Sequence, residues 1–138
     1  MRKIALLSLL LAPALSGCFA LGLGAVAGAL VGTEVLENET YVATLDADAL
    51  RVWYTAKATA ARESFNPIVV DEDRRELTMD YDDAKVTVNI ETFDLDTSIL
   101  RVRARKYGVA NGEIANLIMK RIVEDLDEQL RDQRRGNN

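Results

Sequence analysis

The stretch "VTVNIETFDLDTSILRVRA", residues 86–104, decides the fold. Apolar and polar residues alternate on both sides of the turn sequence "DLDTS" at 94–98, and a period of two is typical of β-strands. The expected inner faces are Val86, Val88 and Ile90 before the turn, and Leu100, Val102 and Ala104 after it. Because each strand is only half apolar, the stretch predicts a hairpin in an antiparallel sheet with one covered face.

Two further strands are predicted before this hairpin. The sequence "TYVATL" at 40–45 is rich in β-branched and aromatic residues, which favour strands. Residues 68–81 form the next strand, which the charged run "DEDRRE" at 71–76 interrupts. Its inner face resumes at Leu77, Met79 and Tyr81. The sheet is therefore expected to contain four strands.

Two helices are predicted from apolar residues spaced three and four apart. Asp46 is expected to cap the first helix, and the segment ends at Asn66 because a following proline disfavours helix. The second begins at Asn111 or Gly112, and residues 131–138 form a solvated polar tail. The expected buried faces are Ala49, Val52, Trp53, Ala56 and Ala60 in the first helix, and Ile114, Leu117, Ile118, Ile122, Leu126 and Leu130 in the second.

The fold class that follows is α+β. A four-stranded antiparallel sheet with two helices on one face, in the order β-α-β-β-β-α, is the economical packing of these elements. We expect one domain at residues 34–130, because the chain length suits a single core.

The start of the chain has the layout of an export signal. Met1, Arg2 and Lys3 are followed by an almost wholly apolar run from Ile4 to Leu15, and a run of this length is typical of a signal peptide. Residues 1–17 are therefore predicted to be removed. Two alternatives are an ordinary secretory cleavage site at Ala12-Pro13-Ala14, which would leave the thiol of Cys18 free, and one uncleaved membrane helix over residues 4–32.

The sequence "LSGC" at residues 15–18 resembles the lipobox of bacterial lipoproteins. This resemblance implies that the Cys18 thiol takes a diacylglycerol, that the signal is cut just before it, and that the new amino terminus is acylated. Several acyl chains would anchor the protein stably to a bilayer. The resemblance also supplies a sorting rule, under which Phe19 rather than Asp after the cysteine favours the periplasmic face of the outer membrane.

A glycine- and alanine-rich segment, "FALGLGAVAGALVG", occupies residues 19–32. Gly24, Gly28 and Gly32 repeat every fourth residue, a spacing that lets helix backbones approach closely in a membrane. The favoured interpretation of residues 18–33 is a lipidated tether, since glycine gives such a segment conformational freedom. A glycine-zipper helix in or against the bilayer is the alternative.

The chain resembles a family of short bacterial lipoproteins that carry a domain of unknown function. The resemblance rests on the lipobox, the glycine and alanine segment, the stretch "TYVATLDADALRVW", the strands that follow and the final helix "YGVANGEIANLIMKRI". It implies the same β-α-β-β-β-α domain and an envelope location. It implies no catalytic motif.

Composition excludes several function classes. The chain contains no histidine and one cysteine, so Ser-His-Asp sites, Cys-His sites and Cys/His zinc sites cannot form. All 22 acidic residues but only 15 of the 17 basic residues lie beyond residue 17, which leaves a net charge of −7 there. An acidic chain is a poor partner for nucleic acid. We expect no cofactor other than the lipid on Cys18, and no metal.

The sequence "RVRARK" at 101–106 could form a binding surface. Arg101, Arg103 and Arg105 must share one strand face, where they could meet an acidic partner or lipid phosphates. The favoured interpretation is instead cross-strand pairing within the sheet. A turn centred near Asp96 would place Glu91 opposite Arg101 and Asn89 opposite Arg103, and another would place Asp80 opposite Lys85.

Two function classes stay open from the sequence. The preferred one is a non-enzymatic envelope lipoprotein, a binding or scaffolding module whose partner is the membrane itself together with another envelope protein or an anionic lipid. The alternative is a carboxylate-dependent envelope enzyme such as a glycan hydrolase, which needs two acids flanking a cleft, roughly 5–10 Å apart.

Overall fold

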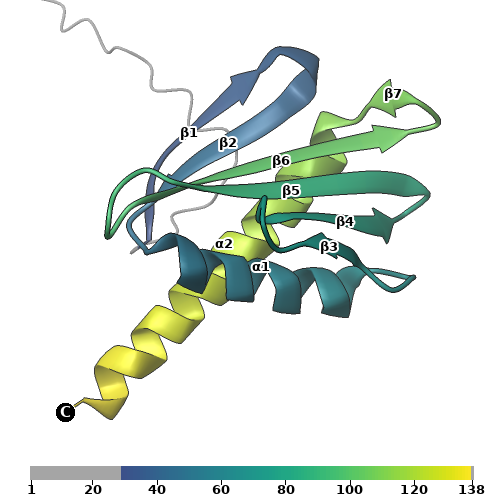
Figure 1. Cartoon of the computed structure of the whole chain (residues 1–138). Coiled ribbons are helices and arrows are strands. Elements are labelled where there is room, and N and C mark those ends of the chain that lie inside the picture. The colour runs from purple at the N-terminus through teal and green to yellow at the C-terminus, as the bar shows by residue number, and fades with distance from the viewer. Residues whose placement is uncertain (1–28, 138) are drawn as a thin grey trace, which may run out of the picture.

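The structure, a computed structural model, describes residues 29–137 and has an α+β fold (Figure 1). An antiparallel sheet in the strand order β1-β2-β6-β5-β4-β3, with the short β7 beside β6, carries two helices on one face. The elements are β1 (Leu30–Leu36), the 3-10 turn η1 (Glu37–Glu39), β2 (Thr40–Leu45), α1 (Ala49–Glu63), β3 (Val69–Asp71), β4 (Glu76–Tyr81), β5 (Ala84–Thr92), β6 (Ser98–Lys106), β7 (Val109–Ala110) and α2 (Gly112–Gly136).

The predicted hairpin at 86–104 is confirmed as the centre of the sheet. β5 and β6 pair along their whole length, from Ala84 opposite Lys106 to Thr92 opposite Ser98. The six inner residues predicted from the alternation are all buried. This confirms the α+β class and the covered face, both of which depend on this alternation.

The number of strands was predicted wrongly, since the sheet has seven strands and not four. β1 includes residues 30–33, which the sequence analysis assigned to the tether. It is an edge strand that pairs only with β2, and most of its residues are exposed, so its sequence lacks a clear alternation. The predicted signal peptide at 1–17, Cys18 and the tether up to residue 28 lie outside the described residues.

The charged run at 71–76 does not interrupt one strand but separates two. Residues 72–75 form a turn in which Arg75 has a φ of 47°, and β3 folds back on β4 with Asp71 opposite Glu76. β3 is the edge strand beyond β4. β7 is a two-residue strand after the turn at Tyr107 and Gly108, and it pairs with residues 105 and 106 of β6.

Helix α1 has the predicted buried face but a different cap. The Asp48 carboxylate, rather than that of Asp46, accepts a hydrogen bond from the Arg51 backbone N–H at 3.0 Å. The Asp46 backbone N–H instead donates to the Ala29 carbonyl at 2.7 Å. The cap therefore lies two residues later than predicted, because residue 46 pairs with the segment that enters the sheet.

Helix α2 begins as predicted, where Asn111 caps the Ile114 backbone N–H at 3.0 Å. Its buried face differs at two positions, because Leu117 and Leu130 are only half-buried, whereas Ile118, next to Leu117, is fully buried. The helix continues to Gly136, so most of the segment predicted as a polar tail at 131–138 is helical, although it is exposed.

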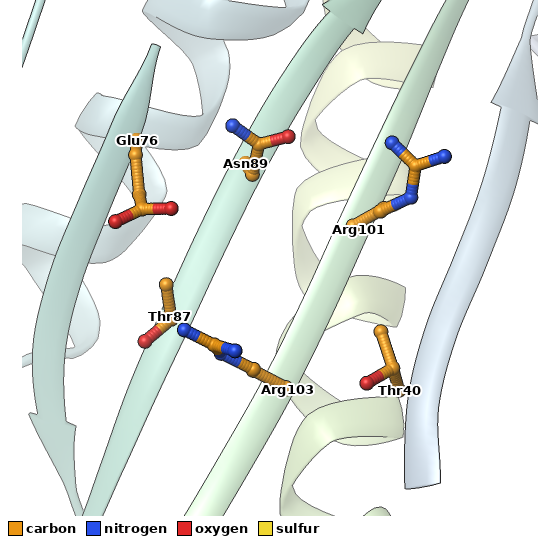
Figure 2. Close-up of a pocket in the computed structure, with 6 residues that line it drawn as sticks. All are labelled: Thr40, Glu76, Thr87, Asn89, Arg101 and Arg103. Carbon is orange, nitrogen blue, oxygen red and sulfur yellow. The ribbon is translucent and has the colours of Figure 1, made fainter. Parts of the chain in front are cut away.

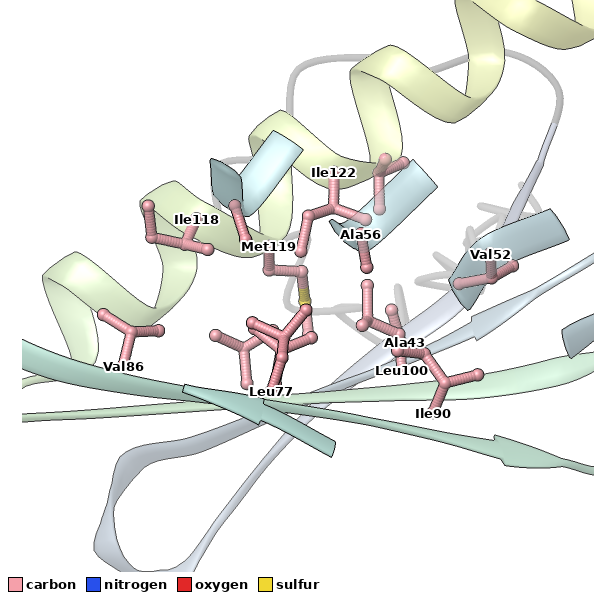
Figure 3. Close-up of a cluster of buried hydrophobic side chains, with 14 of the residues drawn as sticks. Ala43, Val52, Ala56, Leu77, Val86, Ile90, Leu100, Ile118, Met119 and Ile122 are labelled. Atoms are coloured by element: carbon pink, nitrogen blue, oxygen red, sulfur yellow. The ribbon is translucent and has the colours of Figure 1, made fainter. Parts of the chain in front are cut away.

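The core lies between the inner face of the sheet and the two helices, as Figure 3 shows. The apolar residues of both layers are buried together with Trp53, which reaches only 2% exposure. Burial of this kind stabilises by about 25 cal/mol for each Å² of apolar surface. The opposite face of the sheet carries no helix, and it is this face that presents the candidate site.

Candidate functional site

The arginines at 101, 103 and 105 lie on the uncovered face of β6. Side chains alternate along a strand, and the residues between the arginines point into the core. Arg103 and Arg105 are exposed and Arg101 is half-buried. The prediction that the three arginines share one face is therefore confirmed, and that face is open.

A shallow depression of ≈ 200 Å³ lies on this face between four strands (Figure 2). It contains two guanidinium groups, one carboxylate, one amide and two hydroxyl groups. Its lining residues are Thr40 from β2, Glu76 from β4, Thr87 and Asn89 from β5, and Arg101 and Arg103 from β6. In Figure 2 the Arg103 side chain extends from β6 toward Thr87 on β5.

The pairing predicted for the arginines is partly wrong. Phe93 and Asp94 both donate backbone hydrogen bonds to the Thr97 carbonyl, so the turn is centred on Leu95 rather than Asp96. As a result Asn89 lies opposite Arg101, and Thr87 lies opposite Arg103.

An acidic neighbour is found for one of the three arginines. Glu91 still reaches Arg101 along the sheet and forms an ion pair with it. Within residues 29–137, Arg103 and Arg105 form no ion pair with an acidic side chain. Structural pairing therefore accounts for Arg101 and leaves the other two guanidinium groups available.

A fourth basic side chain, Lys85, extends the surface of the three arginines. Lys85 lies opposite Arg105, and its ammonium group is 3.9 Å from the Asp80 carboxylate, which lies opposite it on β4 as predicted. Two like charges opposite each other destabilise a sheet unless an anion neutralises them. Asp80 partly fills that role for Lys85, so the net positive charge here falls on Arg105.

Sequence reasoning missed the polar neighbours of the arginines. Thr87 and Asn89 share the outward face of β5 and could have been found from its alternation. Thr40 and Glu76 come from β2 and β4, which flank the hairpin only because of the strand order β2-β6-β5-β4. That order is a property of the folded chain, and no local pattern indicates it.

Glu72 and Lys106 are among the charged groups outside the depression that have shifted pKa values. The pKa of Glu72 is lowered because Lys57 donates a hydrogen bond to its carboxylate at 2.7 Å, and the Trp53 indole donates a second at 2.6 Å. The pKa of Lys106 is raised by its hydrogen bond to Asp82 at 3.1 Å. Both groups stabilise loops and turns around the sheet.

The part of the chain that the structure describes has neither a cluster of metal-ligating side chains nor a membrane-spanning helix. Among residues 29–137 no three acidic or cysteine side chains come together in a way that could hold a metal ion. Neither helix there is long and apolar enough to cross a membrane. Cys18, the predicted lipidation site, precedes the described residues.

Comparison with known proteins does not assign the chain to a family. No model of a protein family matches the chain, and no curated protein is significantly similar to it.

Proposed function

We propose that this protein is a non-enzymatic bacterial envelope lipoprotein, anchored by lipid on Cys18, whose open sheet face binds an acidic group of a partner. The observation that carries the proposal is the placement of Arg103 and Arg105 on an uncovered face, with no acidic side chain paired to either within residues 29–137. Arg103 lines the depression, and Arg105 lies two residues further along β6, outside it. Guanidinium groups bind carboxylates and phosphates through two parallel hydrogen bonds. The chain as a whole carries more acidic than basic residues. An acidic ligand is therefore attracted to this basic surface rather than to the rest of the protein.

The size of the depression supports a small acidic group rather than a whole metabolite. Pockets that enclose small molecules usually measure about 300–1,000 Å³, whereas this one measures ≈ 200 Å³. A side-chain carboxylate or one phosphate fits such a volume. The hydroxyls of Thr40 and Thr87 and the amide of Asn89 would complete its hydrogen bonds. Both an envelope protein and an anionic lipid can supply the group.

At the depression on the open face, the lining residues favour binding over the alternative of glycan hydrolysis. A carboxylate-dependent hydrolase needs two acids across a cleft, about 5–10 Å apart. Glu76 is the single carboxylate that lines the depression, and Asn89 lies opposite it on β5. The other wall of the depression carries the guanidinium groups of Arg101 and Arg103 in place of a second acid.

The anchor and the location are proposed from the amino-terminal sequence. The lipobox ending at Cys18 supports lipidation, and Phe19 supports the periplasmic face of the outer membrane. We expect Cys18→Ser to give an unprocessed precursor without acyl label after growth with a fatty-acid analogue. Equal labelling of the variant and the wild type would contradict the anchor.

The binding surface is tested by removing the two arginines that lack an acidic neighbour. We expect Arg103→Gln with Arg105→Gln to reduce crosslinking to neighbours in intact cells, while thermal unfolding stays unchanged. A matched control, Arg62→Gln with Lys120→Gln, removes the same charge from the helix layer and should leave crosslinking intact. Wild-type association should weaken with salt, because exposed charges are screened within about 8–10 Å. Crosslinking that survives the first pair of changes would contradict the proposed surface.

A further inference from the structure

Three parts of the fold meet at the end of the sheet where the described chain begins. The Ala29 carbonyl accepts the Asp46 backbone N–H at 2.7 Å, which holds the entering segment beside the start of α1. Leu30 lies opposite Leu45, which lies opposite Ser98 at the start of β6. The turn between β5 and β6 is therefore at the same end of the sheet as Ala29, as Figure 1 also shows.

This turn exposes two large apolar side chains at its tip. Leu95 is 90% exposed and Phe93 is 68% exposed. The turn is not a loose loop, because Phe93 and Asp94 both donate to the Thr97 carbonyl, and the Asp94 carboxylate accepts the Asp96 backbone N–H at 2.9 Å. A closed turn thus holds an apolar tip outward, beyond the last paired residues of the sheet.

The end of α2 lies near the same end of the domain. α2 runs along α1 in the opposite direction, so that Gln129 contacts Thr55 at 3.1 Å and Gln133 contacts Arg51, in the first turn of α1, at 2.6 Å. The last turn of α2 contains Arg134 and Arg135, and both are exposed. Basic side chains therefore lie at the end of the domain that also presents the apolar turn.

We infer that this end of the domain docks on the bilayer that carries the anchor, with Phe93 and Leu95 entering the lipid interface. The inference rests on the proposed lipid anchor. Ala29 is the eleventh residue after Cys18, and eleven residues reach at most about 36–40 Å when fully extended. The anchored chain therefore enters the domain at this end and keeps it within that distance of the membrane.

The chemistry of the tip suits the interface rather than the bilayer centre. Transfer of Phe and Leu side chains out of water stabilises docking, and arginine side chains reach lipid phosphates while their stems stay apolar. Asp94 and Asp96 alternate with the apolar pair and must stay hydrated. Their carboxylates limit entry to the headgroup level.

The opposite end of the sheet provides a matched control. Val109, at 69% exposure, lies in β7 beside the turn at Tyr107 and Gly108. Like the tip of the β5–β6 turn, it is apolar and exposed, but a full strand length separates β7 from the start of β1 (Figure 1). Val109 and the tip of the β5–β6 turn are both exposed, and they differ in their distance from the point where the chain enters the domain.

The experiment places an environment-sensitive fluorophore at each end of the sheet. Cys18 is the single cysteine of the chain and is consumed by the lipid in the proposed form, so Leu95→Cys and Val109→Cys can each be labelled with a nitrobenzoxadiazole dye. The lipidated protein is then reconstituted into vesicles of phosphatidylethanolamine and phosphatidylglycerol. We expect a blue-shifted emission at position 95 that brominated lipids quench and a water-soluble quencher does not. The dye at position 109 should behave as it does in buffer.

Each of the other outcomes contradicts either the docking or the lipid anchor. If the protein floats with the vesicles but the dye at position 95 is open to the aqueous quencher, the docking is wrong and the anchor stands. Shielding at position 109 instead of position 95 also overturns the docking, because the other end would then face the lipid. Failure to float with the vesicles overturns the anchor, and the docking falls with it.

Discussion

Two neighbouring residues of α2 test the packing of the helix on the sheet. Ile118 is fully buried among the core side chains in Figure 3, whereas Leu117 is half-buried at the edge of an open groove with Phe65 and Tyr81. Truncating a buried isoleucine to alanine costs about 2–5 kcal/mol, because it removes apolar contacts and leaves a cavity. The same truncation at a half-buried leucine loses about 1 kcal/mol, since part of the side chain already lies in water.

Thermal and urea unfolding of the chain without residues 1–17 measure this difference. At about 4–8 °C for each kcal/mol, Ile118→Ala should lower the melting temperature by roughly 8–40 °C, and Leu117→Ala should lower it by only about 4–8 °C. The dependence of unfolding on urea should be unchanged in both variants, since the surface exposed on unfolding hardly differs. If Leu117→Ala costs as much as Ile118→Ala, the orientation of α2 on the sheet is wrong.

Three further changes test local contacts. Asn111→Ala should destabilise the domain by about 1 kcal/mol in urea because it removes the cap of α2, and an unchanged midpoint would contradict that role. The lowered pKa of Glu72 means that its contacts stabilise the fold above pH 4.5 and are lost as the pH falls through the lowered value. Emission of Trp53 should therefore titrate with a midpoint below 4.5, and Glu72→Gln should abolish that step, whereas an identical step in the variant would rule out Glu72. Arg101→Gln should lower stability by about 0.2–1 kcal/mol through the lost Glu91 pair, and a melting temperature equal to that of the wild type would assign no stabilising role to that pair.

The elements that local periodicity predicts are the ones that bury a continuous face. β5, β6, α1 and α2 each alternate or repeat apolar residues because one side of each element contacts the core. β1 pairs at the edge of the sheet and buries little, so its backbone hydrogen bonds rather than its side chains place it there. The sequence of such a strand shows no alternation of apolar and polar residues, and Gly32 within it is a residue typical of flexible segments.

The features of the candidate site were likewise predictable where they depend on a local pattern, and not where they depend on the folded chain. The shared face of the three arginines follows from strand alternation within β6, and this local property was predicted correctly. The partner of each arginine depends on the register of the β5–β6 turn, which the backbone bonds to Thr97 set one residue earlier than its composition suggested. The contribution of Thr40 and Glu76 depends on strand order, which only the folded chain determines.

The orientation inferred for the domain narrows the partner of the open face. With the β5–β6 turn at the lipid interface, β6 rises about 3.3 Å per residue away from it, so Arg101 lies roughly 10 Å and Arg105 roughly 23 Å beyond Ser98. Headgroup charges are screened within about 8 Å at physiological ionic strength. If β6 stands along the membrane normal, Arg103 and Arg105 lie beyond the reach of lipid phosphates of the same membrane, and in that orientation we expect the acidic group that meets them to come from a protein beside the domain. Crosslinks from position 103 to lipid would contradict this geometry even if the fold and the anchor were both correct.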